Sequence, residues 1–115
     1  MKPGKDLDML IAEKIMGWVL EPKYVHRWTS PVGTRSDDSD IPNYSTDIAA
    51  AFEVVEVLAK EGAVLNYSTM KDGVRGHFVE IGYLRNPFDS FHAFVEVSGE
   101  SAPHAYCLGA LQTKQ

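Results

Sequence analysis

Histidine is the side chain of this 115-residue sequence best suited to proton transfer or metal binding. The chain contains four, at His26, His77, His92 and His104. A zinc site or a proton-transfer site requires at least two of them near a carboxylate. His77 and His92 fall in neighbouring predicted strands, so a small hydrolase that also uses Glu80 or Glu96 is one hypothesis. Half-exposed strand histidines are the commoner arrangement, and we expect no catalytic residues and no metal site.

Three hydroxyl groups come directly before the clearest helical pattern of the chain, at Tyr44, Ser45 and Thr46. One interpretation is an anion or phosphate site on the free N–H groups of a helix N-terminus. The alternative is a helix cap formed by Ser45 or Thr46, with Tyr44 as a hydrophobic staple. Asp47 follows in the first turn and disfavours a bound anion. We therefore favour the cap, and keep the three residues as candidate ligand-binding residues.

Residues 19–43 are rich in proline, glycine and polar side chains, and we interpret them as a long arm that includes a small β-arm. Tyr24, His26 and Trp28 occupy alternate positions, a pattern for which a passive linker has little use. We predict that the arm carries the partner contacts, with Trp28 as the principal anchor and Tyr24 and His26 beside it. In the competing interpretation, Trp28 is part of the core.

The acidic run within the arm, residues 37–40, has a superficial likeness to a calcium-binding loop. An EF-hand loop needs glycine at its sixth position and glutamate at its twelfth. Counted from Asp37, these positions are Pro42 and Ile48, so the pattern fails. We expect a solvated loop that favours a basic partner surface.

The net charge and the cysteine count exclude several classes of partner and of site. Eleven Lys and Arg against sixteen Asp and Glu give a net charge of −5, so we expect no direct nucleic-acid binding. A single cysteine, Cys107, excludes an internal disulfide and a Cys-based zinc site, and we expect a buried thiol. The sequence has no apolar run of about 20 residues and no visible signal peptide. We expect a cytoplasmic protein with no membrane association and no cofactor.

Hydrophobic periodicity predicts one α+β domain over residues 1–115. The first helix, over residues 7–16, has Asp6 as its cap and Asp8 on its solvent side. The second helix buries the stripe Ile48, Phe52, Val55 and Leu58 or Ala59. Strands over 63–70, 74–83 and 91–97, a tight turn at 71–73, and a helix from the Ser101 cap to residue 111 follow. The order α-α-β-β-β-α predicts a layered α/β sandwich in which a three-stranded antiparallel meander packs against helices.

Three stretches of the chain, at 7–18, 42–56 and 102–111, resemble the small phage and prophage proteins grouped as the phage ABA sandwich domain. The middle stretch, Pro-Asn-Tyr-Ser-Thr-Asp-Ile-Ala-Ala-Ala-Phe-Glu-Val-Val-Glu, is the most specific. Phe52 stands where a tryptophan is common in that family, and the arm is a variable region. The resemblance implies a phage or prophage origin and a small α/β sandwich, but no activity.

We therefore expect a small non-enzymatic phage accessory protein that binds a host protein or a host-derived molecule in the cytoplasm of the bacterial host. Counteraction of host defence is one setting for such a protein. The first alternative is a protein that sequesters a nucleotide-type signalling molecule, and the second is the small hydrolase. All three hypotheses are compatible with a homo-oligomer.

Overall fold

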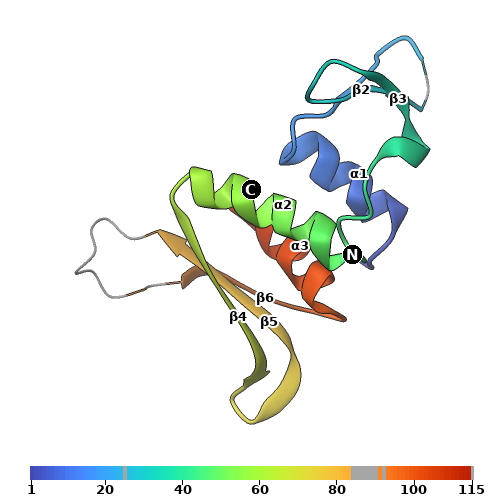
Figure 1. Cartoon of the computed structure of the whole chain (residues 1–115). Helices are drawn as coiled ribbons and strands as arrows, with labels where there is room; N and C mark the ends of the chain where they lie inside the picture. The colour runs from blue at the N-terminus through green and yellow to red at the C-terminus, as the bar shows by residue number, and fades with distance from the viewer. Residues whose placement is uncertain (25, 84–90, 92, 115) are drawn as a thin grey trace.

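The structure of the protein is a computed structural model that describes residues 1–24, 26–83, 91 and 93–114 (Figure 1). Its elements are, in chain order, α1 (Lys5–Lys14), β1 (Val19–Leu20), β2 (Arg27–Thr29), β3 (Arg35–Asp37), the 3-10 turn η1 (Asp38–Asp40), α2 (Ile48–Lys60), β4 (Ala63–Lys71), β5 (Val74–Tyr83), β6 (Ala93–Gly99) and α3 (Ala102–Thr113). The predicted α+β class and the order of the major elements are confirmed.

The main sheet is an antiparallel meander in the order β4-β5-β6. Asp72 and Gly73 form the tight turn between β4 and β5, and both have a positive φ, of 52° and 80°. Such angles suit the twist of a two-residue hairpin turn, and the predicted turn is confirmed. The helices α2 and α3 lie side by side on one face of the sheet, and α1 packs on α3 away from the sheet (Figure 1).

Two glycines let α3 approach the sheet closely. A Cβ atom at Gly109 would lie 3.0 Å from Cδ1 of Ile81, and one at Gly99 would lie 2.6 Å from the backbone nitrogen of Ala105. The start of α3 is fixed by its predicted cap, because the Ser101 hydroxyl accepts a hydrogen bond from the backbone N–H of His104 at 3.3 Å. The last helix is therefore docked at its beginning and along its length.

The buried face of α2 differs from the predicted stripe. Ala50, Ala51, Val54 and Leu58 are the buried residues of this helix. Phe52 is 50% exposed and Ile48 is also exposed, so the prediction that both point inward is wrong. The sequence of α2 contains two apolar stripes, and the one with the alanines faces inward because small side chains permit close packing.

The N-terminal caps of the first two helices also differ from the prediction. Asp47 caps α2, with its carboxylate accepting a hydrogen bond from the backbone N–H of Ala50 at 3.4 Å, in place of Ser45 or Thr46. The helix α1 begins after Gly4 and not after the expected cap Asp6. Gly4 has a φ of 145°, and this end of the helix has no side-chain cap. Both helices begin within two residues of the expected positions.

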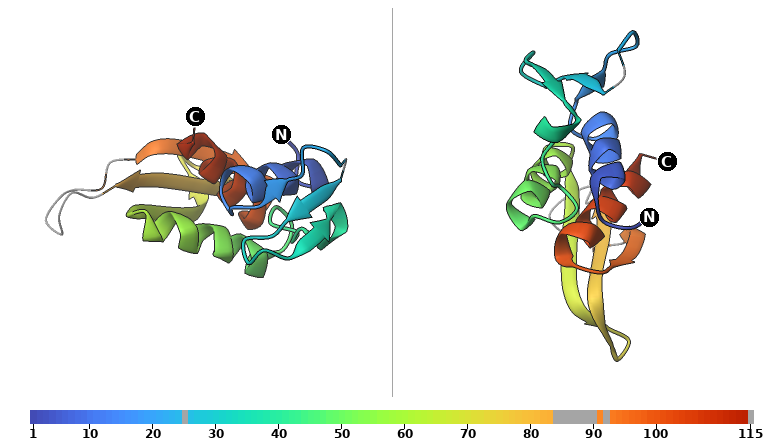
Figure 2. Two further views of the ribbon diagram at one scale, coloured as in Figure 1. Left: turned by 90° about the horizontal axis from the view of Figure 1, so that it is seen from above. Right: turned by 90° about the vertical axis from the view of Figure 1, so that its right-hand side faces the viewer.

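The arm folds into a second small antiparallel sheet, in the order β1-β2-β3, next to α1 (Figure 2). The turn between β2 and β3 is closed by a hydrogen bond from the N–H of Gly33 to the carbonyl of Ser30 at 2.9 Å. This confirms the predicted β-arm. The Trp28 side chain belongs to the main hydrophobic cluster, which extends from α1 through the arm to α3. Within the described residues, no helix has the length and apolar character needed to cross a membrane.

The two faces of α2 predict different responses to truncation. Leu58→Ala should lower the free energy of unfolding by about 2–5 kcal/mol, because it leaves a cavity in the core. Phe52→Ala should lower it by about 1 kcal/mol or less, because the ring is half solvated and lies at the surface beside Tyr106, with ring centroids 6.2 Å apart. Chemical denaturation measures both values, and equal losses would contradict the assignment of the buried face.

Candidate functional site

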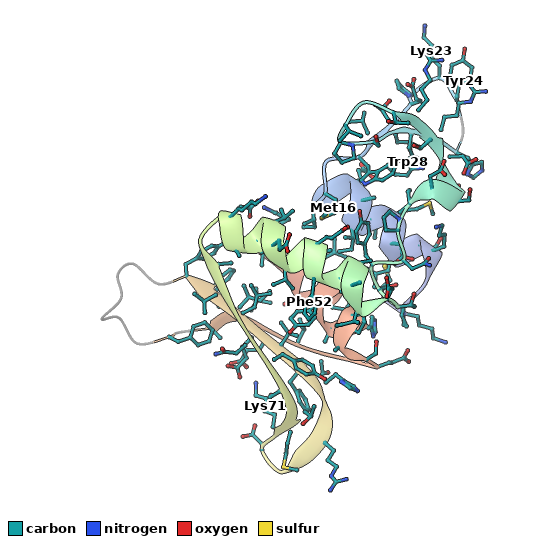
Figure 3. The ribbon with its side chains drawn as sticks, viewed as in Figure 1. Met16, Lys23, Tyr24, Trp28, Phe52 and Lys71 are labelled. Atoms are coloured by element: carbon teal, nitrogen blue, oxygen red, sulfur yellow. The ribbon has the colours of Figure 1, made fainter. Side chains whose placement is uncertain are left out.

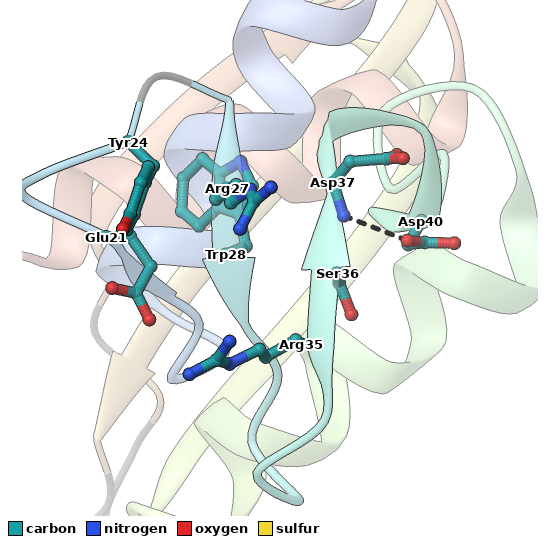
Figure 4. Close-up of a pocket in the computed structure, with 8 residues that line it drawn as sticks. All are labelled: Glu21, Tyr24, Arg27, Trp28, Arg35, Ser36, Asp37 and Asp40. Atoms are coloured by element: carbon teal, nitrogen blue, oxygen red, sulfur yellow. Dashed lines mark hydrogen bonds between the residues drawn. The ribbon is translucent and has the colours of Figure 1, made fainter.

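A hollow of about 270 Å³ opens on the arm, and we call it the arm hollow (Figure 4). Residues of β2, β3, η1 and the β1–β2 connection line it: Glu21, Tyr24, Arg27, Trp28, Arg35, Ser36, Asp37 and Asp40. Five of these eight side chains carry a charge at neutral pH. The hollow therefore combines aromatic surface with groups of both signs.

Two arginines approach the hollow from neighbouring strands. The β2–β3 register pairs Arg27 with Asp37 and Thr29 with Arg35, so the two arginines share one face of the small sheet as diagonal neighbours. The Arg27 guanidinium lies over the Tyr24 ring, 4.9 Å from its centroid. Among the described residues, no carboxylate forms an ion pair with either arginine. Their N–H groups can therefore hydrogen-bond an external acceptor.

The carboxylates of the hollow take part in backbone hydrogen bonds of the arm. Asp37 Oδ1 accepts a hydrogen bond from the Ser39 N–H at 2.8 Å, and Asp40 Oδ2 accepts one from the Asp37 N–H at 2.9 Å. The hydrogen bonds from Ser39 hold the pKa of Asp37 below its usual value. At neutral pH this side of the hollow is anionic.

The arm is held in place by Asp38, on which two neighbours converge. The Trp28 Nε1–H donates a hydrogen bond to Asp38 Oδ1 at 2.6 Å, and His26 Nδ1 lies 2.5 Å from Asp38 Oδ2. His26 has a φ of 64°, which a non-glycine residue rarely adopts. The prediction of a simply solvated acidic loop is therefore wrong for Asp38, whose hydrogen bonds place the Trp28 ring against the hollow.

A larger groove of about 670 Å³ lies between α1 and the arm. It shares Glu21, Tyr24 and Trp28 with the arm hollow, so these three residues separate the two spaces. Half of its other lining residues are apolar, among them Met9, Leu10, Leu20 and Pro22, and His26 also borders it. The arm thus presents a charged hollow and an apolar groove next to each other.

Comparison with known proteins places this geometry in a family. The family model of the phage ABA sandwich domain matches residues 9–111, which include most of α1, the whole arm and nearly all of α3. The chain belongs to the phage ABA sandwich family. The resemblance carried by the three sequence stretches is thereby confirmed.

One solved structure is similar to this family member over almost its whole length. It is the 2.0 Å crystal structure of a phage protein from Bacillus cereus ATCC 14579, with 29% sequence identity and a TM-score of 0.65. The match covers 96% of this chain and 90% of the other. Among the curated proteins, none gives a significant match.

The structure brings together only part of the predicted binding set of this phage ABA sandwich protein. Tyr24 and Trp28 line both spaces, and His26 borders the groove. Tyr24 projects at the outer end of the arm, whereas Trp28 is only 3% exposed (Figure 3). The prediction of Trp28 as the principal anchor is wrong and the competing interpretation holds, because the indole is packed in the core and hydrogen-bonded to Asp38.

In the candidate anion site before α2, the polar groups of Ser45 are already bound by the protein itself. Asp8 Oδ1 accepts hydrogen bonds from the backbone N–H and from the hydroxyl of Ser45, both at 2.7 Å. Asp8 and Ser45 are buried, so the predicted solvent position of Asp8 is wrong. Tyr44 is buried as well, which raises the pKa of its phenol, and its hydroxyl accepts a hydrogen bond from Trp18 Nε1 at 3.3 Å. Thr46 is exposed, and the lining of neither space includes these three predicted residues.

The three histidines that the structure describes, His26, His77 and His104, each contact a different part of the fold. The β5–β6 register pairs His77 with Gly99 at one end of the ladder. His92 lies outside the described residues. The His77 Nδ1 lies 2.6 Å from the Tyr67 hydroxyl, and His104 Nε2 lies 2.7 Å from the Met1 carbonyl. Within the described ranges, no group of three or more His, Cys, Asp and Glu side chains could hold a metal ion.

Sequence reasoning missed Glu21, Arg27 and Arg35 as members of a site. Charged residues in a polar segment are normally solvated, and nothing in their local pattern distinguishes them. The one signal for them was the Ser30–Gly33 turn, because a hairpin closed there brings residue 27 next to residue 37 and residue 35 next to residue 29. Turn chemistry by itself leaves that register open, since hairpin loops of several lengths are compatible with the same residues.

The buried Asp8–Ser45 contact predicts a large loss of stability on its removal. Asp8→Ala leaves the Ser45 N–H and hydroxyl without this acceptor, which should lower the free energy of unfolding by about 2–3 kcal/mol. Asp6→Ala is the matched control, because Asp6 is exposed in the same turn, and its loss should be about 0.5 kcal/mol. Urea denaturation of both variants tests this, and comparable losses would show that the contact contributes little.

Cys107 should be unreactive in the native protein. Its burial raises the pKa of the thiol from 9.0 to about 12, and the thiolate is the form that reacts with alkylating reagents. Iodoacetamide at pH 8 should modify the native protein far more slowly than the urea-unfolded protein, as mass spectrometry can follow. Equal labelling rates would contradict the buried position.

The raised pKa of the Cys107 thiol also makes the stability of the fold depend on pH. The neutral thiol stabilises the folded state below about pH 9, and this contribution is lost as the pH rises towards 12.

Proposed function

We propose that this phage protein is a non-enzymatic binding protein that takes up a host-derived small molecule in the arm hollow. The observation that carries the proposal is the convergence of Tyr24, Arg27 and Arg35 on one concave surface, with no ion pair formed by either arginine among the described residues. Small-molecule sites combine concave aromatic surface with a few polar groups that fix orientation.

The size and the rigidity of the hollow support a small ligand. Its volume of about 270 Å³ lies just below the range for the pockets of drug-sized ligands, roughly 300–1,000 Å³, and so suits a small compound. Its floor is preorganised, because the Trp28 indole is buried and hydrogen-bonded to Asp38 at 2.6 Å. Preorganisation reduces the entropy lost on binding. Uptake of a host molecule by a phage protein would suit counteraction of host defence, in the cytoplasm of the infected cell.

The apolar groove favours a host protein as the second candidate partner. Met9, Leu10 and Leu20 line this groove, and Asp6 and Glu13 lie at its α1 side. An apolar segment with basic flanking residues would suit such a surface, and its association would weaken with added salt. In this case the bound partner would be a polypeptide and not a small molecule.

The proposal is tested by capture from the host. The purified protein is incubated with a small-molecule extract of host cells, desalted and denatured, and the released compounds are identified by mass spectrometry. We expect a compound that is retained by the wild type, lost in Tyr24→Ala, and recovered chemically unchanged after prolonged incubation.

Tyr83→Ala is the matched control for this experiment. Tyr83 is a similarly exposed tyrosine on β5, where it stacks on Phe94 in a different part of the fold. This variant should retain the compound as the wild type does. Retention of nothing, or equal retention by Tyr24→Ala, would contradict the proposal, and conversion of the compound with time would show an enzyme.

A further inference from the structure

We infer that the arm hollow takes a phosphorylated compound with a planar ring, such as a nucleoside monophosphate, with the phosphate between Arg27 and Arg35 and the ring against Tyr24. This inference rests on the proposed function and adds the chemical class of the ligand. It places the phosphate on the arm and not at the N-terminus of α2, where the Asp47 carboxylate already accepts a hydrogen bond from the Ala50 N–H.

The placement of the two arginines specifies the anionic group. As diagonal neighbours on adjacent antiparallel strands, Arg27 and Arg35 have backbones about 7–8 Å apart, within the reach of two long side chains. Figure 4 shows both guanidinium groups in the middle of the hollow, with Tyr24 on one side and Asp37 on the other. A guanidinium donates two parallel N–H groups, which match two oxygens of a phosphate. Two such forks suit a doubly charged phosphate better than a single carboxylate.

The aromatic side chain specifies the second part of the ligand. Tyr24 is 54% exposed, and its ring already carries the Arg27 guanidinium 4.9 Å from the centroid. Guanidinium and nucleobase planes both stack on aromatic rings. A heterocycle that is stacked on the exposed part of Tyr24 places its phosphate substituent towards the arginines. The ring and the anion are thus held by neighbouring side chains.

The acidic residues of the hollow define its polar rim. Asp37 and Asp40 accept backbone hydrogen bonds of η1, and the Glu21 carboxylate accepts one from the Thr29 hydroxyl at 3.4 Å. A carboxylate next to a nucleotide accepts hydrogen bonds from sugar hydroxyls or exocyclic amino groups. The same negative charges disfavour a polyanion, in agreement with a net charge of −5. The site therefore suits one small phosphorylated compound and not a nucleic-acid strand.

The experiment is a calorimetric titration of the full chain at low salt with defined probes. The probes are adenosine 5′-monophosphate and guanosine 5′-monophosphate, the two parent nucleosides, ribose 5-phosphate and inorganic phosphate. We expect at least one of the two nucleotides to bind at least ten times more tightly than its nucleoside, ribose 5-phosphate and inorganic phosphate. Both the phosphate and the ring are then required.

Three arginine variants locate the binding site. Arg27→Gln and Arg35→Gln should each weaken nucleotide binding about tenfold or more, because each removes charged hydrogen bonds to the phosphate. Arg75→Gln is the matched control, since Arg75 is an exposed arginine at the hairpin of the main sheet, and it should leave the affinity unchanged. Both arm arginines are exposed, so the variants should keep the wild-type melting temperature, which is measured alongside.

The inference is overturned if neither nucleotide shows saturable binding. It is equally overturned if the nucleotides bind no better than inorganic phosphate, or if Arg75→Gln weakens binding as much as the arm variants do. The proposed function has a separate outcome: a non-phosphorylated host compound that the wild type retains and Tyr24→Ala loses would support capture at the arm and refute the phosphate. If neither the titration nor the capture experiment gives its expected result, the inference and the proposed function are both refuted.

Discussion

The buried carboxylate of Asp8 is the contact on which the arrangement of the N-terminal half depends. It accepts hydrogen bonds from the backbone and the side chain of Ser45, and the Ser45 hydroxyl in turn accepts one from the Gly4 N–H at 2.8 Å. Three segments therefore meet there: the residues before α1, α1 itself and the approach to α2. A buried charge without these donors would be costly, so the three segments are restricted to one relative placement. The segment between Asp8 and Ser45, which includes the whole arm, therefore has both of its ends held in place.

The arm adds local constraints of its own to this anchoring. Lys5 Nζ donates a hydrogen bond to the Ile41 carbonyl at 3.0 Å, and the Ile41 side chain is buried in the common core. Asp38 holds the Trp28 indole through its Nε1–H. A segment with only short strands thereby acquires a defined surface. The rigid part of the arm hollow comes from core contacts, and its chemistry comes from side chains that remain in solvent.

The sequence pattern predicts an element correctly where interactions between neighbouring residues determine its structure. The Asp72-Gly73 turn and the Ser101 cap are each recognisable within a few residues, and the elements around them were predicted correctly. The pattern was insufficient for α2, because both of its apolar stripes satisfy helical periodicity and only the packing against the sheet and α3 selects one. Asp8 was misplaced for a related reason, since its partner lies 37 residues away. The candidate site was predictable as a region and as the aromatic pair Tyr24 and Trp28, whereas its arginines depend on strand register.

The hydrogen bond between Trp18 and Tyr44 has a consequence for how this protein can diversify. These residues are the two ends of the arm, and the indole N–H of one lies 3.3 Å from the phenol oxygen of the other. The two ends of the segment are thereby held together at the sandwich. The entropic cost of closing such a segment grows only slowly with its length, by about 0.6 kcal/mol for each doubling. Trp28 and Ile41 of the arm belong to the common core, so the freedom to vary lies in the exposed turns between the strands of the arm. Longer, shorter or differently charged turns there can evolve new specificities with little effect on the stability of the scaffold, provided that the two core residues are kept.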